Sequence, residues 1–232
     1  MFKKFFGRFG RKKVNDKNIN LHDALQFISD IENLLKIQCS KIVPVAQIFD
    51  FDGICYFLKE LDTKCIPEGA QYKGACYRPD LDLVFMSTYY PVPDFETFEL
   101  KYTPLTVAEY LFYLAHECRH IWQKKYEEKT FYKKNAIGLE HFHDPAEIDA
   151  DAFALAYVFS DRTPYTFADL PNVIQDIQLD NAVDHGERWA RANEMAITFD
   201  LKSNEKIDAA MTCGDKDKIS FLVGILKLSG KI

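Results

Sequence analysis

The residues of this chain best suited to chemistry are His116, Glu117 and His120, which form the motif H-E-x-x-H. Residues four apart on a helix lie on one face, so the two imidazoles can bind one cation. Glu117 falls about 100° around the helix from His116, where its carboxylate can reach a water molecule beside that cation. Two neutral histidines, an open position for water and a carboxylate base are what a zinc hydrolase needs.

A long helix over residues 106–128 is predicted to carry the motif. Thr106 and Glu109 have the spacing of a capping box, which starts a helix by satisfying two of its backbone N–H groups. Four apolar residues are expected to pack this helix into the body of the protein: Leu111, Leu114, Ala115 and Trp122. The two histidines would then face the active-site cleft.

Zinc needs a third protein ligand, and two glutamates after the motif are candidates. Glu147 would lie in the first turn of a helix, which gives its side chain a fixed direction. Asp151, four residues later, could accept the spare N–H of a ligand histidine. Glu140 has Asp144 at the same spacing, but Pro145 would interrupt a helix joining that pair. Spacing alone leaves both glutamates open, and Glu147 could instead act only as a capping-box carboxylate.

Other side chains are weaker candidates for the site. His141 and His143 lie in an expected loop, and His185 lies near the start of an expected helix, where surface positions are common. A donor to the oxyanion is also needed, and the candidates are His185, Tyr132, Arg188 and Tyr113. Two histidines and one carboxylate suit one Zn²⁺ per chain, although Mn²⁺, Fe²⁺ and Co²⁺ can use the same ligands.

The composition indicates a folded, acidic protein with a basic N-terminal tail. The 232 residues are 47% hydrophobic, and their formal net charge is −6. Residues 1–13 carry six basic residues and no acidic one, interleaved with phenylalanines. We expect residues 1–19 to be a flexible tail, with an anionic surface as its alternative partner. The acidic remainder does not favour binding to nucleic acid.

The six cysteines include no C-x-x-C pair, and a core of this size does not need disulfides. The basic start is not followed by an apolar run of the kind that a secretory signal has. The longest apolar stretch, residues 219–228, is too short to span a bilayer. We therefore expect a cytoplasmic protein with reduced thiols.

Residues 20–232 are expected to form one α+β domain. Ahead of the motif, the patterns predict a helix at 20–37, an edge strand at 41–50, an ambiguous segment at 51–61, strands at 71–77 and 81–87, and a loop at 88–102. After it, they predict an alanine-rich helix from 144 to about 160, helices at 172–179 and 184–197, and an apolar terminal element at 219–228.

The motif, followed by E-I-D-A-D-A-F-A at 147–154, resembles the minimal gluzincin pattern. It is most similar to the IrrE/ImmA-like metallopeptidase domains of bacteria and phages, in which a helix of the form E-x-E-A-N-x-F-A follows H-E-x-x-H. The resemblance implies that Glu147 is the third ligand, and it places Asp149 and Asp151 where the family often has Glu and Asn. Cys118 stands where the family usually has Leu.

The resemblance covers roughly residues 40–160 and leaves a C-terminal helical extension, residues 165–232, outside it. It implies a zincin-like fold, in which a small antiparallel or mixed sheet packs on the metal helix and on the Glu-bearing helix. Arg119 and Gln123 give the variant H-E-C-R-H-x-x-Q, which is found in uncharacterised metallopeptidases. The strands at 71–87 are similar to the short sheet ahead of the family's metal helix.

These features predict a zinc-dependent metallopeptidase with a protein or peptide substrate. Glu117 would take a proton from the attacking water and deliver it to the leaving amine. An edge strand at 81–87 would align an extended peptide by main-chain pairing. By family analogy the substrate would be a regulatory protein. The alternative is a non-catalytic regulatory or interaction module with a metal site. Because a structural site needs no base beside its histidines, Glu117 favours the enzyme.

Overall fold

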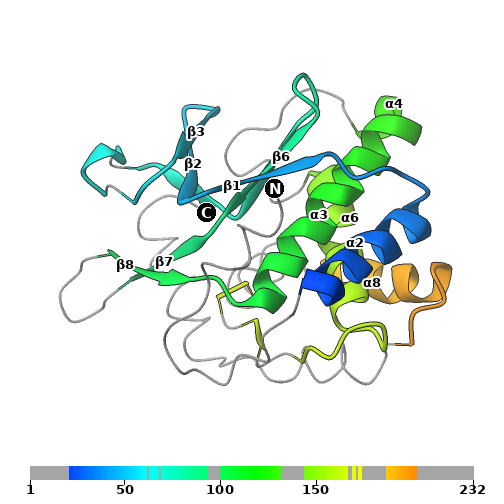
Figure 1. The fold of residues 1–232 in the computed structure, drawn as a ribbon. Coiled ribbons are helices and arrows are strands. Elements are labelled where there is room, and N and C mark those ends of the chain that lie inside the picture. Colours follow the sequence, from blue (N-terminus) through cyan, green and yellow to red (C-terminus); the bar gives the residue numbers. More distant parts are fainter. Residues whose placement is uncertain are drawn as a thin grey trace. The chain divides into compact units, whose positions relative to one another are not determined.

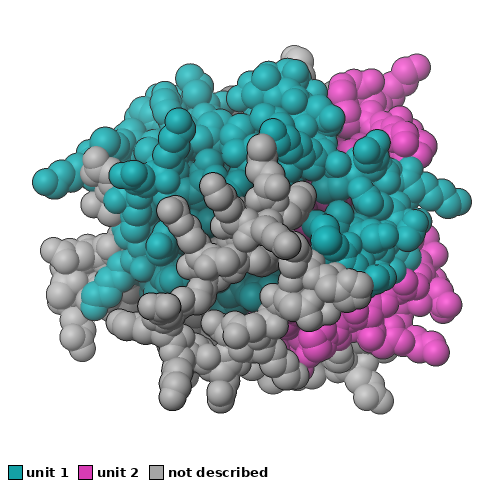
Figure 2. Space-filling model, in the orientation of Figure 1, with its two compact units in different colours: residues 1–110 teal, residues 111–232 magenta. Residues whose placement is uncertain are grey.

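The structure, a computed structural model, has an α+β fold of helices and small sheets (Figure 1). It describes residues 21–61, 63–67, 69–93, 100–131, 144–166, 169–170, 172–173 and 187–202. The chain divides into two compact units, residues 1–110 and 111–232 (Figure 2). The predicted tail at 1–19 and the terminal element at 219–228 lie outside the described residues, as does most of the helix predicted at 172–179.

Unit 1 begins with helix α2 (Leu21–Leu35), as the spacing of its apolar residues predicts. Ile31 and Leu35 are fully or almost fully buried on its inner face. The helix ends at Leu35 and is followed by Lys36, which has a positive φ of 51°. The carboxylate of Glu32 accepts a hydrogen bond from the backbone N–H of Cys39 at 2.8 Å and so holds the chain as it leaves the helix.

The single strand predicted at 41–50 is wrong, because the chain forms two strands that belong to different sheets. Strand β1 (Lys41–Val45) pairs in parallel with β6 (Leu83–Ser87), and β2 (Gln47–Phe51) is the central strand of a second sheet. Ala46 separates them, donating its N–H to Leu58 and accepting from two later residues. The edge position itself is confirmed for β1, where Pro44 can lack its N–H.

The segment that was ambiguous at 51–61 contains strand β3 (Ile54–Leu58), antiparallel to β2. The turn between them is Asp52-Gly53, and both residues have positive φ, 53° and 77°. This is the conformation that a tight two-residue hairpin requires and that glycine adopts without strain. A short 3-10 helix, η1 (Thr63–Cys65), leads to β4 (Gln71–Lys73), which pairs with the other side of β2.

The two strands predicted at 71–77 and 81–87 are confirmed in part. The first is divided at Gly74 into β4 and β5 (Ala75–Arg78), and β5 pairs antiparallel with β6 (Leu83–Ser87). Strand β6 lies between β1 and β5. The prediction that it is an edge strand is therefore wrong, since its main-chain groups already pair on both sides and cannot receive a peptide.

The loop predicted at 88–102 is also wrong in its described part, whereas residues 94–99 lie outside the described residues. Strand β7 (Tyr89–Pro93) and strand β8 (Leu100–Pro104) form a two-stranded antiparallel sheet. Their prolines suggested a loop because proline cannot donate to a sheet. In a two-stranded sheet each strand has an unpaired edge, so prolines are tolerated, and the tyrosines of these strands favour extended structure.

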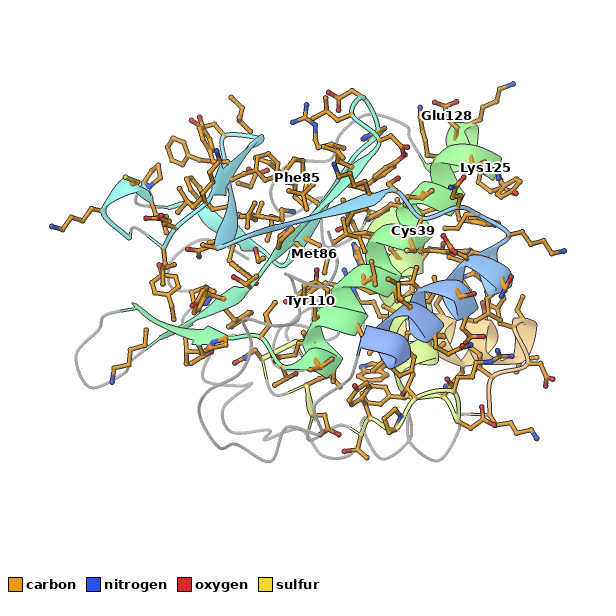
Figure 3. The ribbon with its side chains drawn as sticks, viewed as in Figure 1. Cys39, Phe85, Met86, Tyr110, Lys125 and Glu128 are labelled. Atoms are coloured by element: carbon orange, nitrogen blue, oxygen red, sulfur yellow. The ribbon has the colours of Figure 1, made fainter. Side chains whose placement is uncertain are left out.

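Helix α3 (Val107–Tyr126) carries the H-E-x-x-H motif, and the boundary between the units falls after Tyr110, within it. Its predicted capping box is confirmed: Glu109 N–H donates to the Thr106 hydroxyl at 3.1 Å, and Thr106 N–H donates to the Glu109 carboxylate at 2.9 Å. The helix is followed by α4 (Glu128–Phe131); Lys125 and Glu128 mark this end in Figure 3.

Unit 2 is built around α6 (Pro145–Val158), which packs against α8 (Glu187–Thr198). Both helices confirm the predictions for the part of the chain that is described. Every residue of α6 from Ile148 to Val158 is buried. Its alanines allow the close approach of α8, whose Trp189 and Ala192 are buried in turn. None of the described helices is long and apolar enough to cross a membrane.

Candidate metal centre

Three side-chain atoms from two helices converge in unit 2. The Nε2 atoms of His116 and His120, one turn apart on α3, lie 2.9 Å from each other. Oε2 of Glu147, in the first turn of α6, lies 3.3 Å from the first nitrogen and 3.6 Å from the second. Within the described part of the chain, this is the one group of potential ligands whose atoms all lie within 4.8 Å of one another.

The opposite nitrogen of each ring is held by an oxygen atom. Nδ1 of His116 lies 2.7 Å from Oδ1 of Asp151, and Nδ1 of His120 lies 2.8 Å from Oε1 of Gln123. The amide nitrogen of Gln123 donates to the carbonyl of Ala146 and to a carboxylate, which fixes its oxygen toward His120. Both Nδ1 atoms must therefore carry the hydrogen and donate it.

This tautomer leaves the Nε2 lone pairs of both neutral rings facing each other across 2.9 Å. The carboxylate oxygen of Glu147 adds a third electron-rich atom to the same point. Such a convergence is repulsive unless a cation or a proton lies between the three atoms. The arrangement is therefore one that binds positive charge.

The acidities of the three groups follow from the same contacts. Burial lowers the pKa of His116, but the charges of Asp151 and Glu147 outweigh it and hold that pKa well above its ordinary value. Burial also lowers the pKa of His120, and the charge of Glu147 raises it, with a net increase. Burial raises the pKa of Glu147, yet the two histidines hold it well below its ordinary value.

Two of the three separations at the site match those between the ligands of a zinc ion. Ligand atoms about 2.0–2.2 Å from a tetrahedral metal lie about 3.3–3.6 Å from one another. Oε2 of Glu147 lies 3.3 and 3.6 Å from the two Nε2 atoms, whereas the 2.9 Å between those nitrogens is shorter than this range. A set of two imidazoles and one carboxylate also favours zinc over calcium and magnesium, which prefer oxygen ligands. The residues present therefore fit a bound zinc ion.

Solvent can reach the three ligand side chains. The side chains of His116 and His120 are each 13% exposed and that of Glu147 is 23% exposed. Gln123 is completely buried. Glu117, between the two histidines, is 5% exposed, and its charge contributes to the raised pKa of His120.

A second carboxylate of α6, Asp149, joins three helices behind the ligands. Its side chain is 4% exposed and accepts hydrogen bonds from Arg119 of α3 at 2.7 Å and from Arg191 of α8 at 3.1 Å. The Arg119 guanidinium also lies 3.7 Å from the ring centroid of Trp122. Burial raises the pKa of Asp149, but the hydrogen bonds from these groups and Gln123 hold it below its ordinary value.

The third carboxylate, Asp151, links His116 to α8. Its Oδ2 atom accepts from Nε of Arg188 at 2.7 Å, while Oδ1 accepts from His116. Only 2% of the Arg188 side chain is exposed. The predicted role of Asp151 as the acceptor of a histidine N–H matches this contact. Arg188, predicted only as a donor to the oxyanion, instead has its Nε bound to Asp151.

Of the remaining candidate residues of the site, only Tyr113 lies within the described residues. Glu140, His141, His143, Tyr132 and His185 lie outside the described residues. Tyr113 is half-buried on α3, with its ring 5.6 Å from that of Phe112.

Sequence reasoning missed the roles of Gln123, Arg119 and Arg191. A signal for Gln123 was present, because it follows His120 by three residues and must share its face of the helix. Asp149 offered a second signal, since a carboxylate in so apolar a helix needs a cationic partner.

The comparisons with known proteins add no relative: no family model, no curated protein and no solved structure matches this chain. The resemblance to the gluzincins therefore rests on the residues of α3 and α6 and on the strand pattern at 71–87.

Proposed function

We propose that this protein is a zinc-dependent metallopeptidase of the two-His-plus-Glu class, with a zincin-like fold. The observation that carries the proposal is the convergence of His116, His120 and Glu147, with both imidazoles oriented by oxygen acceptors on their far sides. Zinc sites in proteins use this kind of support to set the tautomer and raise the basicity of their ligands. The proposal includes a cytoplasmic location and one domain over residues 20–232.

In this mechanism a zinc ion held by the three ligands would supply Lewis acidity, lowering the pKa of water and polarising the substrate carbonyl. Glu117 takes the proton of the attacking water and passes it to the nitrogen of the leaving amine. Asp151 and Gln123 keep the Nδ1 hydrogens of the histidines in place, so that both Nε2 atoms stay available as ligands. Buried Arg188 compensates the charge of Asp151.

The proposed substrate is a protein or peptide, by the resemblance and by the presence of a general base. Strand β6 is not available to align it, because both of its edges are paired. The alternative function is a non-catalytic module that binds metal for regulation or for protein interaction. This alternative would be supported if the protein binds zinc at this site but cleaves no peptide.

The substitution Glu117→Gln tests the proposal, because it removes the base and changes no proposed ligand. Glu187→Gln is a matched control, an exposed glutamate of the same unit. The parent and the control should cleave members of a quenched-fluorescent peptide library in the presence of zinc, and Glu117→Gln should lose at least about 100-fold of that rate. All three proteins should hold equal amounts of zinc. Equal cleavage by Glu117→Gln would contradict the mechanism.

A further inference from the structure

Two cysteine sulfurs lie close together in unit 1, to which none of the metal-centre residues belongs. Cys55 is on β3 and Cys76 is on β5, and their Sγ atoms are 3.9 Å apart. The two strands belong to different three-stranded sheets, β3-β2-β4 and β1-β6-β5. Neither cysteine is in a disulfide in this structure.

The strand register explains why these thiols face each other. Phe57, two residues after Cys55, is on the same side of β3. Phe85 is directly opposite Cys76 in the pairing of β5 with β6, and so is on the same side of that sheet. The rings of Phe57 and Phe85 are in contact, with centroids 4.2 Å apart. Phe85 is labelled in Figure 3. A cross-sheet aromatic contact thus lies beside the cross-sheet thiol pair and holds the same two faces together.

The surroundings of the pair favour a reactive Cys55. The Cys76 thiol donates a hydrogen bond to the Cys55 sulfur, and this bond has the largest effect on the pKa of Cys55, which it lowers. The charge of Lys73 lowers this pKa too, whereas burial and the Asp50 carboxylate raise it. The net result is a pKa of Cys55 below its ordinary value. Both cysteines are half-buried rather than enclosed, so a small reagent can reach them.

We propose that Cys55 and Cys76 form a paired-thiol modification site, at which a hydroperoxide oxidises the two thiols to a disulfide that joins the two sheets of unit 1. This inference is independent of the proposed peptidase activity, since it uses none of the residues of the metal centre.

The chemistry balances in two steps. The Cys55 thiolate attacks one oxygen of hydrogen peroxide, so that an S–O bond forms and the O–O bond breaks. The departing oxygen leaves as hydroxide, which takes up the proton that the Cys55 thiol lost on ionising and becomes water. The Cys76 sulfur then attacks the sulfenic sulfur of Cys55, forming the S–S bond and breaking the S–O bond. The hydroxide released takes the proton of the Cys76 thiol and becomes a second water. Two thiols lose two electrons in total, and one peroxide gains them.

The second step requires the two sulfur atoms, 3.9 Å apart, to move toward each other. A disulfide has an S–S length of about 2.05 Å, so the sulfurs must approach by about 1.9 Å. Rotation of the two side chains about their Cα–Cβ bonds moves sulfur atoms over such distances, and the sulfenic oxygen of the first step leaves as the sulfurs meet. The bond would close the chain between residues 55 and 76, which includes η1 and β4.

The test uses the full-length, reduced protein and a small molar excess of hydrogen peroxide, followed by N-ethylmaleimide. Mass spectrometry of an unreduced digest should find the Cys55 and Cys76 peptides linked, with a mass about 2 Da below their sum. Dithiothreitol should separate them. Exposed Cys65 is the internal control and should remain open to N-ethylmaleimide under the same treatment. The proposal is overturned if Cys55 and Cys76 stay alkylatable when Cys65 has reacted, or if Cys55 links to another cysteine.

A second measurement tests which sulfur attacks first. In Cys76→Ser, dimedone should trap a sulfenic acid on Cys55, because no neighbouring thiol can resolve it. In Cys55→Ser, Cys76 should be labelled at least about 10-fold less. Stronger labelling of Cys76 than of Cys55 would overturn the order of the steps. The linkage found in the parent protein does not depend on how either variant folds.

Discussion

The tautomer of each imidazole in the candidate site is set by the oxygen atom to which its Nδ1 hydrogen donates. Asp151 can only accept, and the amide of Gln123 is fixed by its own donors, so the Nε2 atoms are the ones left for a metal. The motif H-E-x-x-H predicts two histidines on one face but cannot show which nitrogen is available. That information comes from contacts with α6, and it turns a spacing argument into a chemical one.

Asp151→Asn tests this support at the scale of one residue. The amide keeps the volume of the side chain but cannot accept fully from both His116 and Arg188. We expect the affinity for zinc to fall roughly 10–100-fold, as it does when such acceptors are lost from other zinc sites. Competition with a fluorescent zinc chelator measures it. Asp161→Asn, an exposed aspartate of the same unit, is the control. Equal affinities in the two variants would contradict the support role.

Some residues of the site could be predicted from the sequence and others could not. Helical spacing makes His116, Glu117 and His120 candidates, because they lie within about one turn of each other. It also places Asp151 one turn after Glu147, but the choice of Glu147 over Glu140 comes from the resemblance. Arg188 lies 37 residues from Asp151, and no local pattern connects them. A contact between separate helices depends on how the chain folds back, which periodicity does not encode.

At the scale of elements, α6 is the part on which the site depends. It is buried from Ile148 onward, yet carries carboxylates at Glu147, Asp149 and Asp151. A buried carboxylate is costly unless it is paired. Asp149 and Asp151 pair with arginines of α3 and α8, and Glu147 contacts the two histidines. These pairings fix the rotation of α6 about its axis, and so direct the Glu147 side chain toward His116 and His120.

Asp149→Asn tests the pairing. It leaves Arg119 buried beside a neutral group, and we expect a loss of about 3–5 kcal/mol in the free energy of unfolding at pH 7. The pKa of Asp149 is lowered by folding, so its contribution is complete above the unfolded pKa of about 3.9 and is lost as pH falls through the folded value. Urea denaturation at pH 7 and below pH 4 should show the difference between parent and variant shrinking in acid. A constant difference would contradict the charge-based account.

The caps of α6 and α3 provide a matched pair of variants. The side chain of Asp144 accepts from Ala146 N–H at 2.9 Å, one residue before Glu147. Both Asp144→Ala and Thr106→Ala should cost about 1 kcal/mol of stability. Only Asp144→Ala should weaken zinc binding, because it frays the turn that holds Glu147, whereas Thr106 lies ten residues before His116. Isothermal titration with zinc separates the two. Equal affinities would show that the cap does not position Glu147.

Helices were predictable here because their capping and spacing signals are local. The capping box of α3 and the N-cap, proline and alanines of α6 all lie in the segments that they shape. Strands were predicted less well. The break at Ala46 between two sheets and the pairing of the proline-bearing β7 with β8 depend on partners elsewhere in unit 1. Strand preference reflects such surroundings more than local sequence.

At the scale of the whole chain, the described site lies entirely in unit 2, but not within the segment that resembles the gluzincins. That segment ends near residue 160, and α8 supplies Arg188 and Arg191 to the carboxylates of α6. The C-terminal extension therefore contributes two arginines to the carboxylates that surround the candidate metal site. Truncation before α8 would leave two buried carboxylates without these arginines.

The central claim is that His116, His120 and Glu147 hold one zinc ion, and metal content measures it most directly. Purified parent protein, Glu147→Ala and the control Glu187→Ala should be supplied with zinc, freed of excess and analysed for zinc per chain. The parent and the control should retain about one zinc each, and Glu147→Ala should lose most of it. Full retention by Glu147→Ala would move the third ligand elsewhere. No zinc in the parent would contradict the account of the site.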